Sequence, residues 1–148
     1  MQRIIEKTLK RNISGDELYL KMYYSRCRVF AISGYKDEND LGHNVYELFD
    51  SSSINFIPAS IACVNKQDLG LCLFATDIYY RRQGYGKELM DALKNIYKGE
   101  KLHLYVRVSN KTAIEFYKSL GWIETEIVPN FYWDTLNDED AIKMELHN

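Results

Sequence analysis

The fold of this chain is decided by the stretch Arg81-Arg82-Gln83-Gly84-Tyr85-Gly86-Lys87, which follows the apolar run 69–77. After Gly84 the apolar residues take helical spacing, with one stripe formed by Leu89, Met90, Leu93, Ile96 and Tyr97. The first turn of a helix leaves N–H groups without intrahelical partners, and the helix dipole makes this end positive. Gly84 and Gly86 have no Cβ atom to block an approaching anion, and the neighbouring Arg and Lys residues add positive charge. The stretch therefore predicts a diphosphate-binding turn between a buried strand and a helix.

The same stretch has other interpretations. A plain strand-to-helix turn contains the same glycines and binds nothing. A nucleotide P-loop needs glycine at position 81 and Ser or Thr after Lys87, where Arg81 and Glu88 stand. A dinucleotide fingerprint needs a third glycine at position 89, which is Leu89. Both of these phosphate loops are therefore excluded.

Outward from this turn, strand and helix patterns alternate. Upstream, the apolar runs 54–64 and 69–77 flank the polar turn 65–68, as in a hairpin. Downstream, the helix ends at Lys98-Gly99, and a second helix begins after the caps Ser109 and Asn110 and stops at Gly121. The other expected elements are strands over 28–32, 102–108, 122–127 and 141–146, a polar loop over 34–43, a helix over 44–50 ended by Ser51-Ser52-Ser53, a helix start at Ser14-Gly15-Asp16, and a strand or short helix over 2–10. This order predicts an α/β layered domain with a central sheet.

Length and charge set limits on the class of protein. A chain of 148 residues with 46% hydrophobic and 27% charged residues fits one globular domain, 1–148. The net charge of -2 comes from interspersed acidic and basic residues, so nucleic acid is not expected as a partner. The N-terminus lacks an apolar signal core, and no apolar run reaches membrane-spanning length. We therefore expect a cytoplasmic protein without a membrane partner.

The cysteines do not suggest a metal site or a disulfide framework. Cys27, Cys63 and Cys72 are an odd number, show no CxxC spacing and lie among apolar residues. Buried, reduced thiols are expected at all three positions.

Two segments together resemble the GNAT superfamily of N-acetyltransferases. The first is Arg81-x-x-Gly84-x-Gly86, which follows the strand 73–77 and opens a helix, as the pyrophosphate loop of that family does; Ile78 stands where the family usually has proline. The second is Asn110-x-x-Ala113-x-x-x-Tyr117-x-x-x-Gly121-Trp122, which is similar to the family segment Asn-x-x-Ala-x-x-x-Tyr-x-x-x-Gly-Phe. The resemblance covers about residues 70–148 and implies acetyl-CoA as the co-substrate.

The resemblance implies a GNAT-type fold, a mostly antiparallel mixed sheet of about six to seven strands flanked by helices. Its fourth and fifth strands, here 71–77 and 102–108, would splay apart to admit pantetheine. The resemblance divides the chain into an acceptor side, roughly 1–68, and a cofactor-binding core, roughly 69–148. The implied cofactor-binding residues are Phe74, Ala75 and Thr76 through their backbone, then Arg81, Arg82, Gln83, Gly84, Tyr85, Gly86 and Lys87 at the diphosphate, and Asn110.

The same resemblance implies that Tyr117 is catalytic and protonates the departing thiolate. A tyrosine with its ordinary pKa near 10 is still a proton donor at neutral pH. On its own, Tyr117 would be taken as a core residue of the helix face formed with Ala113, Ile114 and Leu120. The general base is unassigned. Tyr105 stands where relatives often have His or Glu, and His103, Asp77 and Glu47 are the other candidates for the base.

The last segment resembles that of family members that acetylate protein N-termini, including ribosomal-protein alanine enzymes. The resemblance rests on Asn130-Phe131-Tyr132 followed by residues 139–144, and it implies that Tyr105 and Tyr132 contact the acceptor. The expected function is transfer of an acetyl group to a primary amine, such as a protein or peptide N-terminus. The alternatives are acetylation of a small amine, such as a polyamine or amino sugar, and a catalytically silent acyl-CoA-binding module.

Overall fold

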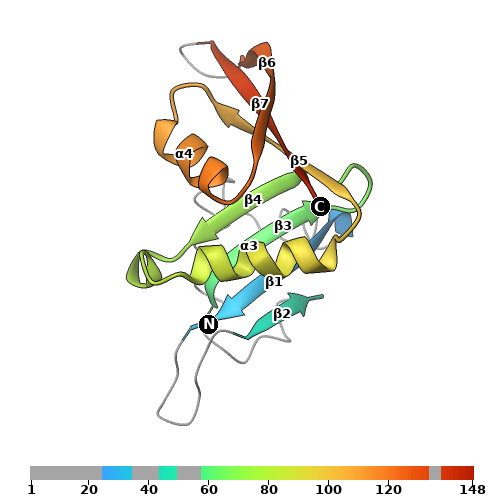
Figure 1. The fold of residues 1–148 in the computed structure, drawn as a ribbon, viewed down its shortest axis with the longest axis vertical. Helices are drawn as coiled ribbons and strands as arrows, with labels where there is room; N and C mark the ends of the chain where they lie inside the picture. The colour runs from blue at the N-terminus through green and yellow to red at the C-terminus, as the bar shows by residue number, and fades with distance from the viewer. Residues whose placement is uncertain (1–24, 35–43, 50–57, 134–137) are drawn as a thin grey trace. The chain divides into compact units, whose positions relative to one another are not determined.

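The computed structural model describes residues 25–34, 44–49, 58–133 and 138–148 (Figure 1). The chain divides into two compact units, Met1–Asn95 and Ile96–Asn148. Each unit contains one antiparallel sheet, so the two are described separately.

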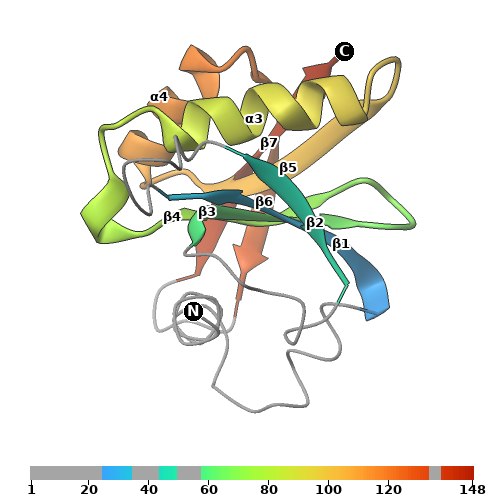
Figure 2. The ribbon, with the colours of Figure 1, turned by 90° about the horizontal axis from the view of Figure 1, so that it is seen from below.

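The first unit holds a four-stranded sheet in the order β2-β1-β3-β4, with every pairing antiparallel. Helix α3 covers one face of this sheet (Figures 1 and 2) and buries Tyr85, Leu89, Met90 and Leu93. The bounds are β1 Cys27–Ser33, β2 Val45–Leu48, β3 Pro58–Asn65, β4 Leu71–Thr76 and α3 Tyr85–Ile96, with a 3-10 turn, η2, at Ile78–Tyr80.

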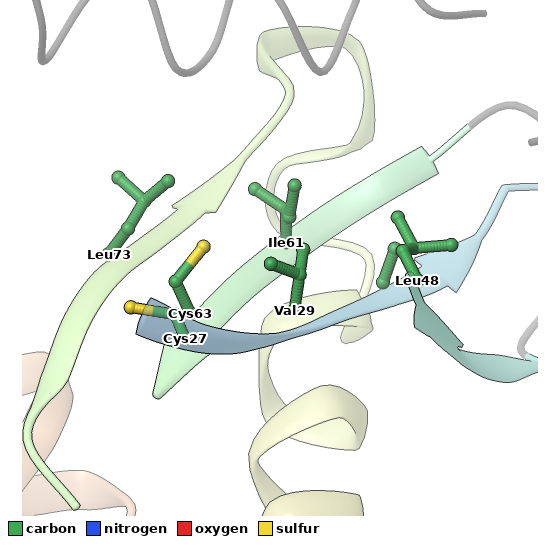
Figure 3. Packing of buried hydrophobic residues seen from close by; sticks show 7 residues of the cluster. Cys27, Val29, Leu48, Ile61, Cys63 and Leu73 are labelled. Carbon is green, nitrogen blue, oxygen red and sulfur yellow. The ribbon is translucent and has the colours of Figure 1, made fainter. Parts of the chain in front are cut away.

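Strands β1 and β3 are buried on both faces, which explains their nearly continuous apolar sequences. Side chains of one face form a cluster (Figure 3). The cluster consists of Cys27, Val29, Ala31, Leu48, Ile61, Cys63 and Leu73, with Ala75 packed against it. Through Leu73 and Ala75, this packing holds β4 against the rest of the sheet.

The expected turn between β3 and β4 is present. The side-chain oxygen of Asn65 accepts hydrogen bonds from the N–H groups of Gln67 at 2.8 Å and Asp68 at 3.1 Å. This is the local turn chemistry that Asn favours. Beyond the turn, the register between β3 and β4 shifts at Cys63/Val64, which pair with Leu73 and Leu71 and leave Cys72 as the extra residue.

The second unit holds a three-stranded antiparallel sheet in the order β5-β7-β6. Its elements are β5 Lys101–Arg107, α4 Lys111–Ser119, β6 Ile123–Tyr132 and β7 Glu139–His147. Asn110 caps α4, because its side-chain oxygen accepts the N–H of Ala113 at 3.2 Å. Gly121 then takes a φ of 97° directly after the helix, as predicted for its end.

Strand β6 contains a bulge that has consequences for the site. Val128 pairs with Ala141 and Tyr132 pairs with Glu139, so the three residues 129–131 stand opposite Asp140 alone and β6 has two extra residues here. Asn130 has a φ of 51° and donates its N–H to the Asp140 carboxylate at 3.0 Å. Phe131 and Tyr132 therefore lie at the end of β6, at the bulge, where the strand departs from regular pairing with β7.

The predicted fold class, a mixed α/β chain with antiparallel sheets of about seven strands, is confirmed. Strand β4 belongs to the four-stranded sheet and strand β5 to the three-stranded sheet, and the expected separation of these two strands stays a prediction. Every pairing among the described residues is antiparallel, so they contain no parallel pair of the expected mixed sheet. The assignment of 1–148 to one domain stays a prediction.

Some expectations were wrong. The helix expected over 44–50 is strand β2, because Val45–Leu48 pairs with β1 and a segment this short does not sustain a helix alone. The strand expected over 122–127 continues to Tyr132. Ile96 is 41% exposed rather than on the buried stripe, and Cys72 is exposed rather than buried.

Several expected elements fall outside the described residues: the element over 2–10, the helix start at Ser14-Gly15-Asp16, the part of the polar loop over 35–43, the break at Ser51-Ser52-Ser53 and the start of the run 54–64. Within the described ranges, no helix combines the length and apolar character needed to cross a membrane.

Candidate functional site

The predicted cofactor turn begins where β4 ends. Asp77 caps the short η2 turn, since its carboxylate accepts the N–H of Tyr79 at 2.9 Å. Arg81 Nε donates to the Thr76 carbonyl at 3.4 Å, and Gln83 Nε2 donates to the Tyr79 carbonyl at 2.9 Å. The side chains of Arg81 and Gln83 therefore hold the shape of the turn.

Gly84 stands at the start of α3 in a conformation that favours glycine. Its φ is 86°, and the first intrahelical bond joins Glu88 N–H to its carbonyl at 3.0 Å. A Cβ atom built on Gly84 would meet nothing within 4 Å. The N–H groups of a first helical turn have no intrahelical acceptor. An anion can therefore approach this end of α3 over Gly84 without a steric obstacle from the described residues.

Of the other residues of the turn, Tyr85 packs in the interior, whereas Arg82 and Lys87 are exposed and charged. Tyr85 is 3% exposed, and its ring packs edge-to-face on Tyr80 at 5.4 Å, so only its backbone suits a ligand. Arg82 is exposed with a φ of 62°, and Lys87 is exposed with its Nζ 3.2 Å from the Asp91 carboxylate. Arg81, Arg82 and Lys87 thus supply positive charge near an open helix end.

Strand β4 is the edge of its sheet, which suits the predicted backbone contacts. Phe74, Ala75 and Thr76 pair on one side with Ala62, Ile61 and Ser60 of β3. The Thr76 hydroxyl is tied to the Ser60 hydroxyl at 2.6 Å, which fixes the end of the strand. An edge strand presents N–H and C=O groups on its other side to a ligand.

In the second unit, Asn110 and Tyr117 lie at the two ends of one helix face of α4. Asn110 uses its side-chain oxygen for the cap. The Tyr117 ring packs edge-to-face against Trp122 at 5.8 Å and Phe116 at 5.6 Å. Burial raises the pKa of Tyr117 to about 12, because the phenolate would lose its hydration. The hydroxyl therefore stays protonated throughout the physiological pH range.

The structure brings Tyr105 and Tyr132 into one aromatic cluster, joined by Phe131. The Tyr105 and Phe131 rings are stacked, with centroids 4.6 Å apart, and Phe131 packs edge-to-face on Tyr132 at 4.9 Å. The Arg107 guanidinium lies 4.0 Å from the centroid of the Tyr132 ring. This cluster, defined by Tyr105, Phe131, Tyr132 and Arg107, combines aromatic rings that carry polar groups with a cation in the second unit.

A carboxylate fixes Arg107 in this cluster. Arg107 donates to Glu139 at 3.2 Å, and Glu139 also accepts the N–H of Ser109 at 2.9 Å. Sequence reasoning missed the roles of Arg107 and Glu139. The signal was present in β5, where His103, Tyr105 and Arg107 alternate along one strand face.

Two of the residues considered as general base are engaged in structural roles. Hydrogen bonds from Arg28, at 2.7 and 3.0 Å, hold the pKa of Glu47 below its usual value. Asp77 is used as the cap of η2. His103 packs edge-to-face on Tyr105 at 5.7 Å and belongs to the second unit. Among the described residues, no group of three or more His, Cys, Asp or Glu has an arrangement that could hold a metal ion.

Comparisons with known proteins point to one family. The sequence model of the acetyltransferase (GNAT) family matches residues 17–122. The chain is 44% identical over 69 residues to an N-alpha-acetyltransferase of Sulfurisphaera tokodaii. The matched segment covers 44% of this chain and 40% of that protein. It is 46% identical over 77 residues to the ribosomal protein bS18-alanine N-acetyltransferase of Escherichia coli. This match covers 49% of this chain and 51% of that protein. The chain thus spans about half the length, or less, of these curated relatives.

A solved structure agrees with the sequence comparisons. The crystal structure of the ribosomal-protein-S18-alanine N-acetyltransferase from Escherichia coli superimposes with a TM-score of 0.51 at 34% identity. The superposition covers 76% of this chain and 71% of that chain.

Proposed function

This chain belongs to the acetyltransferase (GNAT) family, and from that premise we propose that it transfers the acetyl group of acetyl-CoA to a primary amine at a protein or peptide N-terminus. The observation that carries the proposal is the turn at Gly84, where a Cβ atom would meet nothing within 4 Å. This turn begins helix α3, and Arg81, Arg82 and Lys87 lie next to it in the sequence. Such an end binds phosphate groups through backbone N–H groups and helix dipole together. The diphosphate of coenzyme A carries two such groups in sequence.

Within this proposal, backbone groups and side chains have separate roles at the cofactor. Phe74, Ala75 and Thr76 offer the backbone of the edge strand β4 to the pantetheine arm. The turn from Arg81 to Lys87 holds the diphosphate, and Asn110 contacts the cofactor in addition to capping α4. The proposal treats 1–148 as one domain, with an acceptor side over 1–68 and a cofactor-binding core over 69–148.

The chemistry assigned to the chain is direct acyl transfer from a thioester to an amine. The amine attacks in its neutral form, because a protonated amine has no lone pair. Backbone N–H groups near Thr76 stabilise the oxyanion that forms. When the thiolate leaves, Tyr117 donates its phenolic proton to the sulfur, a role that its raised pKa permits at every physiological pH.

The acceptor class is inferred from the aromatic cluster. Tyr105, Phe131 and Tyr132 form a continuous aromatic surface beside the Arg107–Glu139 ion pair. Aromatic rings with polar tips suit the first residues of a peptide, which present both apolar side chains and backbone groups. The name of the Escherichia coli relative, which acts on an alanine of a ribosomal protein, supports a peptide acceptor.

The test is a mass-spectrometric screen of acetylated products with acetyl-CoA and a panel of peptides, polyamines and amino sugars. We expect acetylation at peptide α-amines and slow or no reaction of the small amines. Faster turnover of polyamines or amino sugars would show that the acceptor is a small amine. Coenzyme A binding measured by calorimetry without turnover of any acceptor would identify the chain as a silent acyl-CoA-binding module, which the tyrosine at position 105 would then explain.

A further inference from the structure

Three cysteines gather at one end of the four-stranded sheet. They are Cys27 on β1, Cys63 on β3 and Cys72 on β4. Cys27 and Cys63 are buried in the cluster of Figure 3, whereas Cys72 is exposed. The Cys27 and Cys72 sulfurs are 3.9 Å apart, a hydrogen-bonding distance for sulfur. The exposed thiol therefore has a buried thiol as its neighbour.

The backbone explains why Cys72 reaches this position. It is the extra residue at the register shift between β3 and β4, opposite Cys63 and Val64. A bulge of this kind redirects a side chain relative to regular alternation. The turn that precedes it is fixed by Asn65, and Asp68 in turn accepts the N–H of Gly70 at 2.8 Å. Cys72 is thus held in place by a defined turn and not by a loose loop.

The charge on the pair is expected to reside on Cys72. The S–H of Cys27 donates to the Cys72 sulfur, which lowers the pKa of Cys72 to about 7, against the opposing effects of partial burial and of Asp68. The pKa of Cys27 is raised, first by the same hydrogen bond and then by burial, and burial raises that of Cys63. Because Cys27 is the donor and Cys72 the acceptor of this hydrogen bond, the negative charge is stabilised on the Cys72 sulfur. A thiolate that is both accessible and populated near neutral pH is the reactive form of cysteine.

We propose that Cys72 is a covalent modification site for small-molecule disulfides such as glutathione disulfide, with Cys27 as the hydrogen-bond donor that prepares it. The Cys72 thiolate attacks one sulfur of the disulfide and forms a new S–S bond. The S–S bond of the reagent breaks, and its other half leaves as a thiolate. The disulfide is itself the oxidant, so no further reactant is needed. The proposal is independent of the acetyltransferase activity.

An internal Cys27–Cys72 disulfide is not the expected product. Strand β3 lies between β1 and β4, so two interstrand spacings, about 9.5 Å, separate the backbones. A disulfide takes Cα–Cα distances of roughly 4.4–6.8 Å. Closing the bond would require the strands to move together across a packed core. Cys27 therefore serves as a hydrogen-bond donor to Cys72, and the sulfur that forms a disulfide with Cys72 comes from the external reagent.

The experiment treats the full chain with excess glutathione disulfide between pH 5.5 and 9.5 and follows the intact mass, with peptide mapping of the adduct. We expect one bound glutathione per chain, located at Cys72, and a rate that rises with a midpoint near pH 7. An unperturbed cysteine has its midpoint at about pH 8.5. A midpoint at or above 8.5, an adduct at Cys27 or Cys63 in the folded chain, or a product lighter by two hydrogens would each overturn the proposal.

Matched variants separate the donor from the nucleophile. Cys72→Ser, at an exposed position, should abolish the adduct while keeping the thermal unfolding midpoint. Cys27→Ala removes the donor and should move the midpoint of the rate towards that of an ordinary cysteine, whereas Cys27→Ser retains a hydroxyl donor and should move it less. An unchanged midpoint in a folded Cys27→Ala chain would refute the role of Cys27. If neither Cys27 variant folds, the pH profile of the unsubstituted chain alone decides the proposal.

Discussion

The guanidinium of Arg107 lies 4.0 Å from the centroid of the Tyr132 ring, which places a fixed cation against a residue of the proposed acceptor surface. Arg107 comes from β5, and Tyr132 ends the bulged part of β6. Between these strands, β7 supplies Glu139, which bonds Arg107 at 3.2 Å and the N–H of Ser109 at 2.9 Å. The orientation of the Tyr132 ring therefore depends on a residue that need not touch the acceptor.

Replacing Arg107 with Met should weaken acceptor binding more than cofactor binding. Methionine keeps the length of the side chain but loses the cation, and a cation–π contact contributes about 0.5–2 kcal/mol. We expect the KM for an acceptor peptide to rise by roughly 2–30-fold, with the KM for acetyl-CoA within a factor of about two. Steady-state kinetics with each substrate varied in turn measures both values.

The matched control is Arg107→Lys, which keeps the charge but loses the planar face that stacks on the ring. Its effect should fall between those of the unsubstituted chain and Arg107→Met. Equal increases in both KM values, or a change confined to the thermal midpoint, would mean that Arg107 supports the sheet and does not position Tyr132.

The parts of this chain that sequence predicts well are those fixed by local chemistry. The turn at Asn65, the cap at Asn110 and the glycine turns at Gly84 and Gly121 depend on neighbouring residues, and all are present. The segment 44–50 was mispredicted because its structure depends on pairing with β1, which local spacing does not encode.

The candidate site shows the same division. The glycine turn, the strand before it and the α4 helix face were found as linear motifs. The contact of Arg107 with Tyr132, the bridging role of Glu139 and the pairing of Cys27 with Cys72 join residues 25 to 45 positions apart in sequence, and only the register of the sheets brings them together. The sequence analysis predicted none of these contacts, although the alternation along β5 places Arg107 on the strand face of Tyr105.

Gly84→Ala should reduce coenzyme A affinity, and Gly99→Ala provides a control with the same backbone strain. The φ angles are 86° at Gly84 and 85° at Gly99, and a Cβ at either position meets nothing within 4 Å. Each alanine should therefore lower the free energy of unfolding by a similar amount, about 1 kcal/mol. Only the methyl group at position 84 lies where the diphosphate is proposed to approach.

Calorimetric titration with coenzyme A and urea unfolding of both variants measure these effects. We expect at least a tenfold loss of affinity for Gly84→Ala and less than a twofold loss for Gly99→Ala. The assignment of the diphosphate to this turn fails if the two variants bind coenzyme A equally well.

Glu47→Gln should destabilise the edge strand β2. Glu47 binds Arg28 with both carboxylate oxygens, at 2.7 and 3.0 Å, and links β2 to β1. Both side chains are partly exposed, so the expected loss in free energy of unfolding is about 1 kcal/mol or less. Asp91→Asn removes the more exposed pair with Lys87 on α3 and should cost about 0.3 kcal/mol.

The pH dependence identifies the origin of the Glu47 effect. Hydrogen bonds from Arg28 lower the pKa of Glu47 in the folded chain, so its stabilisation is present above the unfolded pKa of about 4.3 and is lost as the pH falls through the folded value. The difference in urea midpoint between the unsubstituted chain and Glu47→Gln should shrink between pH 6 and pH 3. A difference that is constant over this range would show that charge pairing is not its cause.

Tyr117→Phe should lower kcat by a factor of about 10²–10⁴, the range for loss of a general acid, while coenzyme A affinity stays within about twofold. The control is Tyr46→Phe on the edge strand β2, which should leave kcat unchanged. Because burial raises the pKa of Tyr117 to about 12, its hydroxyl remains protonated below that pH, and no alkaline loss of kcat below about pH 10 should arise from it. Any alkaline limb that does occur at lower pH must therefore persist in the residual activity of Tyr117→Phe. If kcat of Tyr117→Phe equals that of the unsubstituted chain, the proton reaches the leaving thiolate from another donor, and the Tyr117 ring serves only to pack against Trp122.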